Sequence, residues 1–168
     1  MRKHHLLGAI LLCGGLFSCS SEVIQQANYE IIPLPQEIKI STGNFVLNDR
    51  TSIVYPKGND EMQQNANLLA TYIRQMSGKK LKVIDEQITS NVITLTTGLN
   101  TDNAEAYQLK VTPDNIIIRG ASEAGTFYGI QTLRKSLPAT NKGDISLPGV
   151  EINDYPRFSY RGVHLDVS

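Results

Sequence analysis

One stretch, YQLKVTPDNIIIRGASEAGTFYGIQTLRKS at residues 107–136, decides the fold. Residues 107–111 alternate polar and apolar side chains, residues 112–115 carry a turn signal, and residues 116–119 return as an apolar run. This pattern predicts a β-hairpin. Three consecutive isoleucines indicate that the second strand is covered on both faces. Ser122 then predicts the N-cap of a helix that runs to about Ser136 and ends before Pro138.

Two glycines lie in the predicted helix. Gly125 and Gly129 are four residues apart, so they share one face of the helix. Each costs about 1 kcal/mol of helix propensity relative to alanine. We expect close contact between this face and neighbouring backbone as the compensation.

A second helix is predicted upstream, over residues 60–76. Its apolar residues recur at spacings of 4, 3, 4 and 3, which makes one stripe along the helix: Met62, Ala66, Leu69, Ile73 and Met76. Asp60 with Gln63 suits a capping box, and Gly78 suits the C-terminal end. The stripe is interpreted as core packing and not as a cofactor site.

Short extended segments surround the two helices. Prolines keep residues 31–35 extended. Residues 37–40 and 45–47 predict a hairpin around a turn at 41–44, and further strands are expected at 51–55, 81–84 and 91–96. The order of elements predicts an α+β domain over residues 31–153, with a mainly antiparallel sheet and two helices on one face.

The N-terminus has the pattern of a targeting segment. A short positive stretch precedes an apolar run at residues 6–17, which is too short to span a membrane. Ser18-Cys19 then resembles a lipobox. Residues 1–18 are predicted to be a lipoprotein signal peptide, Cys19 the lipid-bearing residue, and residues 19–30 a tether, so the protein is expected in the cell envelope. An ordinary secretory signal with a chance cysteine is the alternative.

Composition excludes several classes of function. The formal net charge is zero, so no basic excess indicates nucleic acid as a partner. The only cysteines are Cys13 and Cys19, and His164 is the one histidine outside the signal. No metal site is therefore expected. The glycines at 120, 125 and 129 lack a following Gly-Lys-Ser/Thr, so no phosphate loop and no cofactor are expected.

The C-terminal residues 161–168 predict a strand, with Gly162, His164 and Asp166 on one face. A lone charged strand is a poor end for a domain. It is better interpreted as the first strand of a truncated barrel, reached through a linker, so that residues 154–168 form the linker and that strand. A full (β/α)8 barrel needs about 250 residues, more than the chain provides.

These residues carry a family resemblance. The run Asp154-x-Pro156-Arg157-Phe158-x-x-Arg161-Gly162-x-x-Leu165-Asp166-x-Ser168 resembles the entry into the catalytic barrel of family 20 glycoside hydrolases, the β-N-acetylhexosaminidases. Two upstream runs are similar to that family's front domain: Glu105-Ala106-Tyr107-x-Leu109-x-Val111 and Ile116-x-Ile118-x-Gly120-Ala121-x-x-x-Gly125-x-Phe127-Tyr128-Gly129-x-Gln131-Thr132-Leu133. The resemblance covers roughly residues 30–168.

The resemblance implies an α+β front domain followed by a TIM barrel. It also implies exo-acting removal of terminal β-linked N-acetylglucosamine or N-acetylgalactosamine from glycans, by substrate-assisted retaining catalysis. The family's catalytic Asp-Glu pair lies further along the barrel, so no catalytic residue is assigned here and the fragment alone is expected to be inactive.

Two residues are candidates for the substrate site by this resemblance. Arg161 matches the arginine that holds hydroxyls of the terminal sugar, and a guanidinium can donate two parallel hydrogen bonds to them. A structural ion pair is the alternative. Asp166 is a candidate for supporting the site, with an ordinary buried aspartate equally open. His164 is interpreted as a packed barrel residue.

Two other functions remain open on the sequence. The chain could be the front domain of a different barrel glycosidase. It could also be a non-catalytic glycan-binding envelope lipoprotein.

Overall fold

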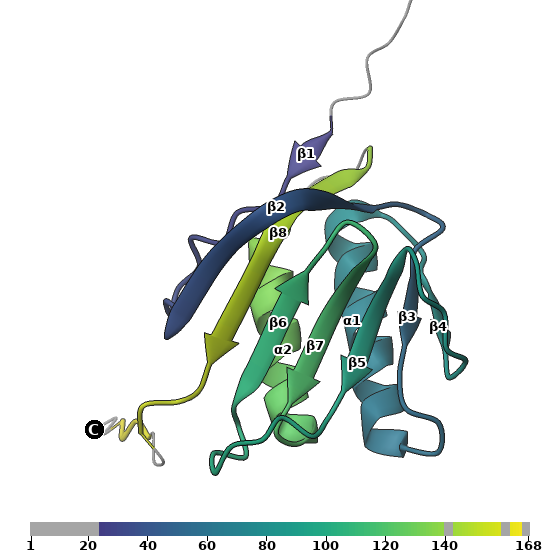
Figure 1. The fold of residues 1–168 in the computed structure, drawn as a ribbon. Coiled ribbons are helices and arrows are strands. Elements are labelled where there is room, and N and C mark those ends of the chain that lie inside the picture. The colour runs from purple at the N-terminus through teal and green to yellow at the C-terminus, as the bar shows by residue number, and fades with distance from the viewer. Residues whose placement is uncertain (1–23, 140–142, 159–161, 166–168) are drawn as a thin grey trace, which may run out of the picture.

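The computed structural model describes residues 24–139, 143–158 and 162–165. These residues form one sheet and two helices (Figure 1). The elements follow in the order β1 (Gln25–Gln26), β2 (Glu37–Leu47), β3 (Ser52–Val54), α1 (Asp60–Ser77), β4 (Lys82–Ile84), β5 (Val92–Thr96), β6 (Tyr107–Val111), β7 (Asn115–Gly120), α2 (Glu123–Ser136) and β8 (Ile145–Asp154).

The sheet is mixed. From β8 it runs through β6, β7, β5 and β3 to β4, and β1 and β2 also pair with β8. The pairs β2–β8, β6–β8 and β6–β7 are antiparallel, whereas β5–β7, β3–β5, β3–β4 and β1–β8 are parallel. Helix α1 connects the parallel neighbours β3 and β4, which need a crossover. The predicted α+β class with two helices on one face is confirmed (Figure 1).

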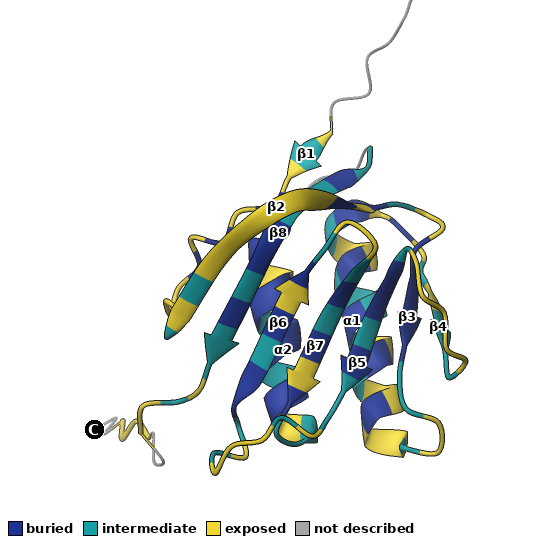
Figure 2. Cartoon of the chain, viewed as in Figure 1, coloured by how far each residue is buried: buried dark blue, intermediate teal, exposed yellow. Residues whose placement is uncertain are grey.

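The core lies between the sheet and the helices (Figure 2). The α1 stripe faces it as predicted, with Met62, Ala66, Leu69 and Ile73 all fully buried. On the sheet, alternate residues of β6 and β7 point to the same core, which is why the hairpin pattern is so regular. Ile117, the middle isoleucine, is only half-buried, because the helices cover one face of the sheet.

The glycine face of α2 lies directly on the β6–β7 hairpin, as expected. A Cβ atom at Gly125 would collide with the carbonyl oxygen of Ala106, and one at Gly129 would collide with the side chain of Ile118. The glycines therefore allow the helix to approach the sheet at van der Waals distance.

The ends of α1 are set by Asn59 and Gly78. Asn59 is the N-cap, and its side chain accepts a hydrogen bond of 3.0 Å from the backbone N–H of Met62. The capping box predicted at Asp60 was wrong by one residue, because Asp60 already has helical geometry. Gly78 ends the helix with φ of +73°, as predicted.

The hairpin predicted between residues 37–40 and 45–47 was wrong. These residues form the single strand β2, which pairs along its length with β8. The register shifts between Ile40 and Asn44, so that residues 41–43 form a bulge opposite Gly149. The predicted turn is thus a bulge that bends a long strand.

Strand β8 was not predicted, and it pairs with β1, β2 and β6. The tether predicted at residues 19–30 was also wrong in its described part. Residues 25–26 pair with the start of β8, and Tyr29 is buried with its hydroxyl donating to the carbonyl oxygen of Pro148 at 2.8 Å. The domain therefore begins before residue 31.

The barrel strand predicted at 161–168 is not formed in the described residues 162–165. Val163 and Leu165 are exposed there, and neither lies in a strand. A strand needs a neighbour that pairs with its backbone, and no described strand pairs with this segment. Across the described residues, no helix is both long and apolar enough to cross a membrane.

Candidate functional site

The three residues singled out from the sequence, Cys19, Arg161 and Asp166, lie outside the described residues. The predicted signal peptide, residues 1–18, lies outside them as well. His164 is described and exposed, which differs from the packed position expected of it. The roles assigned to Arg161, Asp166 and Cys19 therefore stay predictions.

The structure instead shows a cavity of about 650 Å³ where β8 ends. Its walls come from residues 31–36, from α2 and from the segment 154–157, and Glu105 and Tyr107 also line it. These segments meet because β2 and β8 are antiparallel. The pair Glu37–Asn153 places the chain before β2 beside the chain after β8 (Figure 1).

Tyr107 is the buried polar centre of this cavity. Its hydroxyl lies 2.5 Å from Oγ1 of Thr132 on α2 and donates to a carboxylate oxygen of Asp154 at 3.1 Å. Burial raises the pKa of the Tyr107 hydroxyl well above its ordinary value, and the neighbouring Asp154 carboxylate adds to the increase. The neutral hydroxyl therefore joins α2 to the end of β8.

The segment 31–36 is fixed at both ends by polar contacts. The backbone N–H of Gln36 donates to the second carboxylate oxygen of Asp154 at 3.1 Å. The ammonium of Lys135 on α2 donates to the carbonyl oxygen of Ile32 at 2.9 Å. Asp154 thus accepts from the residue that precedes β2 and from Tyr107 on β6.

Gln131, which also lines the cavity, has an unsatisfied buried donor. Its side-chain nitrogen is buried and has no hydrogen-bond partner among the described residues, whereas its oxygen accepts from Arg134 at 3.3 Å. Such a group loses its hydration without a compensating bond. Helix α2 therefore carries a buried donor that lacks an acceptor among the described residues.

This arrangement does not resemble a catalytic centre. The Asp154 carboxylate is engaged by two donors, so it is not placed as a general acid. Among the described residues no cluster of three or more histidine, cysteine, aspartate or glutamate side chains could hold a metal ion. The cavity is suited to binding and positioning.

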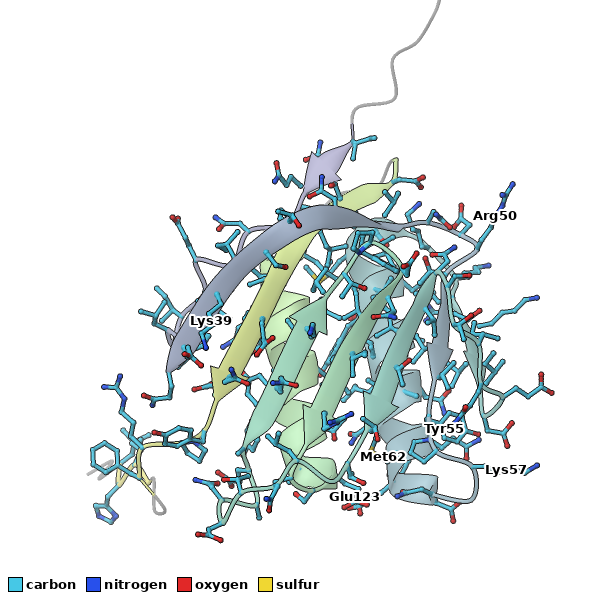
Figure 3. The ribbon with its side chains drawn as sticks, viewed as in Figure 1. Lys39, Arg50, Tyr55, Lys57, Met62 and Glu123 are labelled. Atoms are coloured by element: carbon cyan, nitrogen blue, oxygen red, sulfur yellow. The ribbon has the colours of Figure 1, made fainter. Side chains whose placement is uncertain are left out.

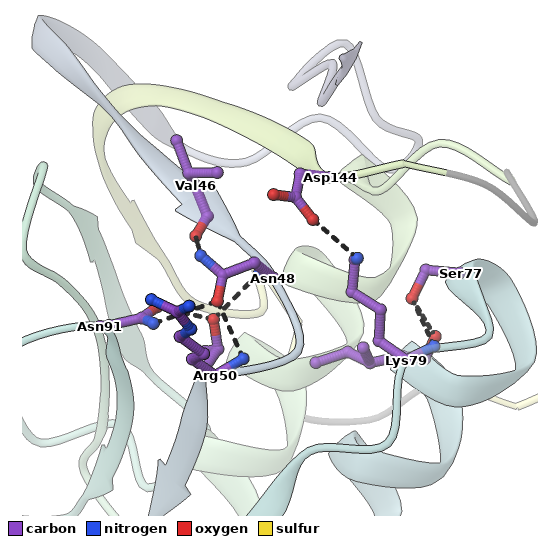
Figure 4. A network of polar contacts seen from close by, with 9 residues as sticks. Val46, Asn48, Arg50, Ser77, Lys79, Asn91 and Asp144 are labelled. Atoms are coloured by element: carbon purple, nitrogen blue, oxygen red, sulfur yellow. Dashed lines mark hydrogen bonds and ion pairs between the residues drawn. The ribbon is translucent and has the colours of Figure 1, made fainter. Parts of the chain in front are cut away.

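Polar groups elsewhere have structural roles. The buried ammonium of Lys79 pairs with Asp144 at 2.9 Å and joins the end of α1 to the segment before β8 (Figure 4). The loop after β2 is closed by Asn48, whose side-chain oxygen accepts from Asn91 at 3.2 Å. The cations Lys39, Arg50 and Lys57 lie on separate parts of the surface and do not converge (Figure 3).

Sequence reasoning missed the cavity because its walls come from three distant segments. Asp154 was noted only as the first residue of the barrel-entry motif, and Gln131 only within the front-domain motif. The prolines at 33 and 35 were the available signal that residues 31–36 form an irregular, ordered wall.

Three comparisons agree on the relatives of this chain. The profile of "Glycosyl hydrolase family 20, domain 2" matches residues 28–155. A Beta-hexosaminidase of Porphyromonas gingivalis is 34% identical over 182 residues, covering 98% of this chain and 23% of that protein. A Beta-N-acetylhexosaminidase of Cellulomonas fimi is 29% identical, covering 82% of this chain and 28% of that protein.

Solved structures share the fold. The family 20 β-N-acetylhexosaminidase of Streptomyces coelicolor superposes with a TM-score of 0.71 at 26% identity, over 78% of this chain and 27% of that one. The Streptomyces plicatus N-acetyl-β-hexosaminidase, solved with Thio-NAglucal, gives a TM-score of 0.68 at 26% identity. The chain thus spans about a quarter of the length of these relatives.

Proposed function

The chain belongs to glycosyl hydrolase family 20, and we propose from this that it is the front domain of an exo-acting β-N-acetylhexosaminidase. The match of the domain 2 profile to residues 28–155 is the observation that carries the proposal. The full-length protein would release terminal β-linked N-acetylglucosamine or N-acetylgalactosamine from glycans. Its mechanism would be the substrate-assisted form of retaining glycoside hydrolysis.

The role of this domain in the proposed enzyme is to hold a catalytic barrel and not to supply the acid. The Asp154 carboxylate at the cavity is occupied by two donors, so it is not placed as a general acid. A (β/α)8 barrel beginning within residues 154–168 would bring the catalytic residues. Its first strand would carry Arg161 to the sugar hydroxyls and Asp166 beneath them.

A chromophore-release assay tests the proposed activity. The purified 168-residue chain should release no chromophore from an aryl β-N-acetylglucosaminide, whereas the full-length protein should release it. Turnover by the 168-residue chain would place a catalytic acid within it. Inactivity of the correctly folded full-length protein on aryl glycosides of both N-acetylhexosamines would end the proposal.

Arg161 is tested in the full-length enzyme. Arg161→Ala should lower kcat/KM by about 10- to 100-fold, the value of one hydrogen bond to a charged group. Arg161→Lys should restore little of it, because an ammonium cannot donate in a planar fork. Arg50→Ala, at an exposed loop arginine, is the control and should leave kcat/KM unchanged. Equal behaviour of Arg161→Ala and the control would remove the assignment.

The lipid anchor at Cys19 is a separate proposal about location. A positive stretch, an apolar run and Ser18-Cys19 support it. Acylation would place the enzyme at an envelope membrane, where it meets glycans. Mass spectrometry of the mature N-terminus should find Cys19 bearing an acyl mass. An unmodified Cys19 at that terminus, or cleavage elsewhere, would contradict it.

A further inference from the structure

A second cavity lies between α1 and β4, at the edge of the sheet. Its volume is about 410 Å³, within the roughly 300–1,000 Å³ range of small-molecule sites. One wall is a face of α1, and the other is the chain from Lys80 into β4. Strand β4 ends the sheet on the side away from β8 (Figure 1), so this cavity is separate from the one where β8 ends.

Two cations line this cavity without an ion-pair partner. Arg74 lies in the last turn of α1, and Lys80 lies two residues before β4. Both residues are exposed, and no ion pair among the described residues involves either side chain. A single exposed cation is ordinarily only solvated. Two cations that border one cavity make its potential positive and favour an anionic group there.

Apolar side chains contribute to both walls of the cavity. Ala70 on α1, and Leu81 and Val83 on the other wall, are half-buried and pack against the core. A bare inorganic anion gains nothing from an apolar surface, because such an ion is most stable in water. A ligand that uses the whole cavity therefore carries both a negative charge and carbon atoms that are removed from water.

Two polar side chains complete the α1 wall. Asn67 and Thr71 are four residues apart, so they share one face of the helix. The Thr71 hydroxyl donates to the backbone carbonyl oxygen of Asn67 at 2.9 Å, and its own oxygen can still accept. The Asn67 side-chain amide has no hydrogen-bond partner among the described residues. These groups suit the hydroxyls of a sugar, which both donate and accept.

We propose that this cavity binds an anionic saccharide, that is, a sugar ring bearing a carboxylate or a sulfate ester. The Arg74 and Lys80 side chains bond the anionic group. The apolar residues pack against the ring carbons, and the amide and hydroxyl of the α1 wall bond the ring hydroxyls. The choice of a sugar rests on the proposed function, whereas the preference for an anion rests on the cavity alone.

An extended peptide is a poorer occupant of this cavity. Strand β4 has only three residues, and lysines stand at positions 80 and 82. Short edge strands that carry lysine resist the addition of another strand. A sugar needs no backbone pairing, because side chains alone would hold it.

Binding is tested by NMR titration of the 168-residue chain with four probes. N-acetylglucosamine 6-sulfate and N-acetylneuraminic acid carry the two anionic groups on a sugar, N-acetylglucosamine has no charge, and inorganic sulfate has no ring. At least one anionic sugar should bind about 10-fold more tightly than N-acetylglucosamine. It should shift the backbone N–H signals of Ala70, Thr71 and Val83. The sugar site of the proposed enzyme is incomplete in this chain and does not compete.

Three results of the titration would overturn the proposal. Absence of binding by both anionic sugars ends it directly. Equal affinity for N-acetylglucosamine and the anionic sugars would show that the cavity does not select for charge. Equal affinity for inorganic sulfate and the better anionic sugar would leave an adventitious ion only.

Matched variants test the location of the site. Arg74→Gln and Lys80→Gln should each weaken binding of the anionic sugar by about 2- to 5-fold, the value of an exposed ion pair. Lys57→Gln is the control, because Lys57 is an exposed cation near the opposite end of α1 (Figure 3). It should leave the affinity unchanged, and none of the three should lower the unfolding midpoint. Equal losses for Lys57→Gln and Arg74→Gln would contradict the site.

These outcomes are distinguishable from failure of the proposed function. A full-length protein that hydrolyses the aryl glycoside, from a chain whose cavity binds no anionic sugar, keeps its activity assignment and loses this site. Selective binding by the 168-residue chain, with no hydrolysis by the full-length protein, keeps the site and ends the activity assignment.

Discussion

At the scale of single residues, two buried tyrosines fix β8 at different points. The Tyr29 hydroxyl donates to the carbonyl oxygen of Pro148, and the Tyr107 hydroxyl donates to the Asp154 carboxylate. Burial raises the pKa of both hydroxyls well above the ordinary value of 10.0. The folded domain therefore favours the neutral form of each hydroxyl.

This predicts a loss of stability at high pH. In the unfolded chain both tyrosines ionise near pH 10, whereas in the folded chain they keep their protons. Their contribution is present below that pH and is lost as pH rises toward the folded-state pKa. The free energy of unfolding should fall by about 1.4 kcal/mol per tyrosine per pH unit above pH 10. In denaturant titrations at a series of pH values, the free energy of unfolding of Tyr29→Phe and of Tyr107→Phe should each fall less steeply with pH than that of the wild type.

Gly125 offers a second residue-scale prediction. By helix propensity alone, Gly125→Ala would stabilise the domain by about 1 kcal/mol. In the structure the added Cβ collides with the Ala106 carbonyl oxygen, so we expect a net loss of about 1–3 kcal/mol in the free energy of unfolding. The exposed neighbouring change Ala124→Gly should cost about 1 kcal/mol by propensity only. A stabilised Gly125→Ala variant would show that α2 does not contact the hairpin this closely.

At the scale of elements, the two helices are linked at both ends. Near their N-termini the Asn59 amide donates to the Glu123 carboxylate at 3.0 Å, a bond that lowers the pKa of Glu123. Further along, the Arg134 guanidinium lies 4.3 Å from the centre of the Tyr72 ring. Asn59 thus caps α1 and ties it to α2 at the same time.

The cap position is testable by comparing adjacent residues. Asn59→Ala should lower the free energy of unfolding by about 1–2 kcal/mol, because both the cap and the bond to Glu123 are lost. Asp60→Ala should cost only about 0.3–1 kcal/mol, through the helix dipole. Urea unfolding of the two variants measures the difference. A larger loss for Asp60→Ala than for Asn59→Ala would favour the capping box expected from the sequence.

At the scale of the whole molecule, the N-terminal segment completes the fold. Residues 25–26 pair with the start of β8, and Ala27 and Tyr29 belong to the core. A true tether would contribute nothing to stability. Here it packs against the sheet ahead of β2.

Truncation therefore distinguishes a tether from a segment that packs against the sheet and stabilises the domain. A chain starting at Ile24 should unfold like the 168-residue chain without its first 18 residues. A chain starting at Ile31 should lose about 2 kcal/mol or more, chiefly from the burial of Tyr29. Its midpoint should then fall by at least ~4 °C in a thermal melt. Identical midpoints for the two truncations would restore the tether interpretation.

The amino-acid sequence by itself determined the parts of this protein that depend on local pattern. The hairpin at 107–120, both helices and the need for glycine at 125 follow from periodicity and capping over short windows, and the motif residues identified the family. Each of these features is specified by residues close together in the chain.

Only the tertiary structure decided the features that join distant segments. Strand β8 was not predicted because it contains Pro148 and Gly149, which are uncommon inside strands. The structure tolerates them because the bulge of β2 lies opposite. The cavity beside α2 likewise exists only because antiparallel pairing of β2 with β8 brings residues 31–36 beside residues 154–157. Strand pairing and cavity shape depend on contacts between residues more than a hundred positions apart, and a local pattern carries no record of such contacts.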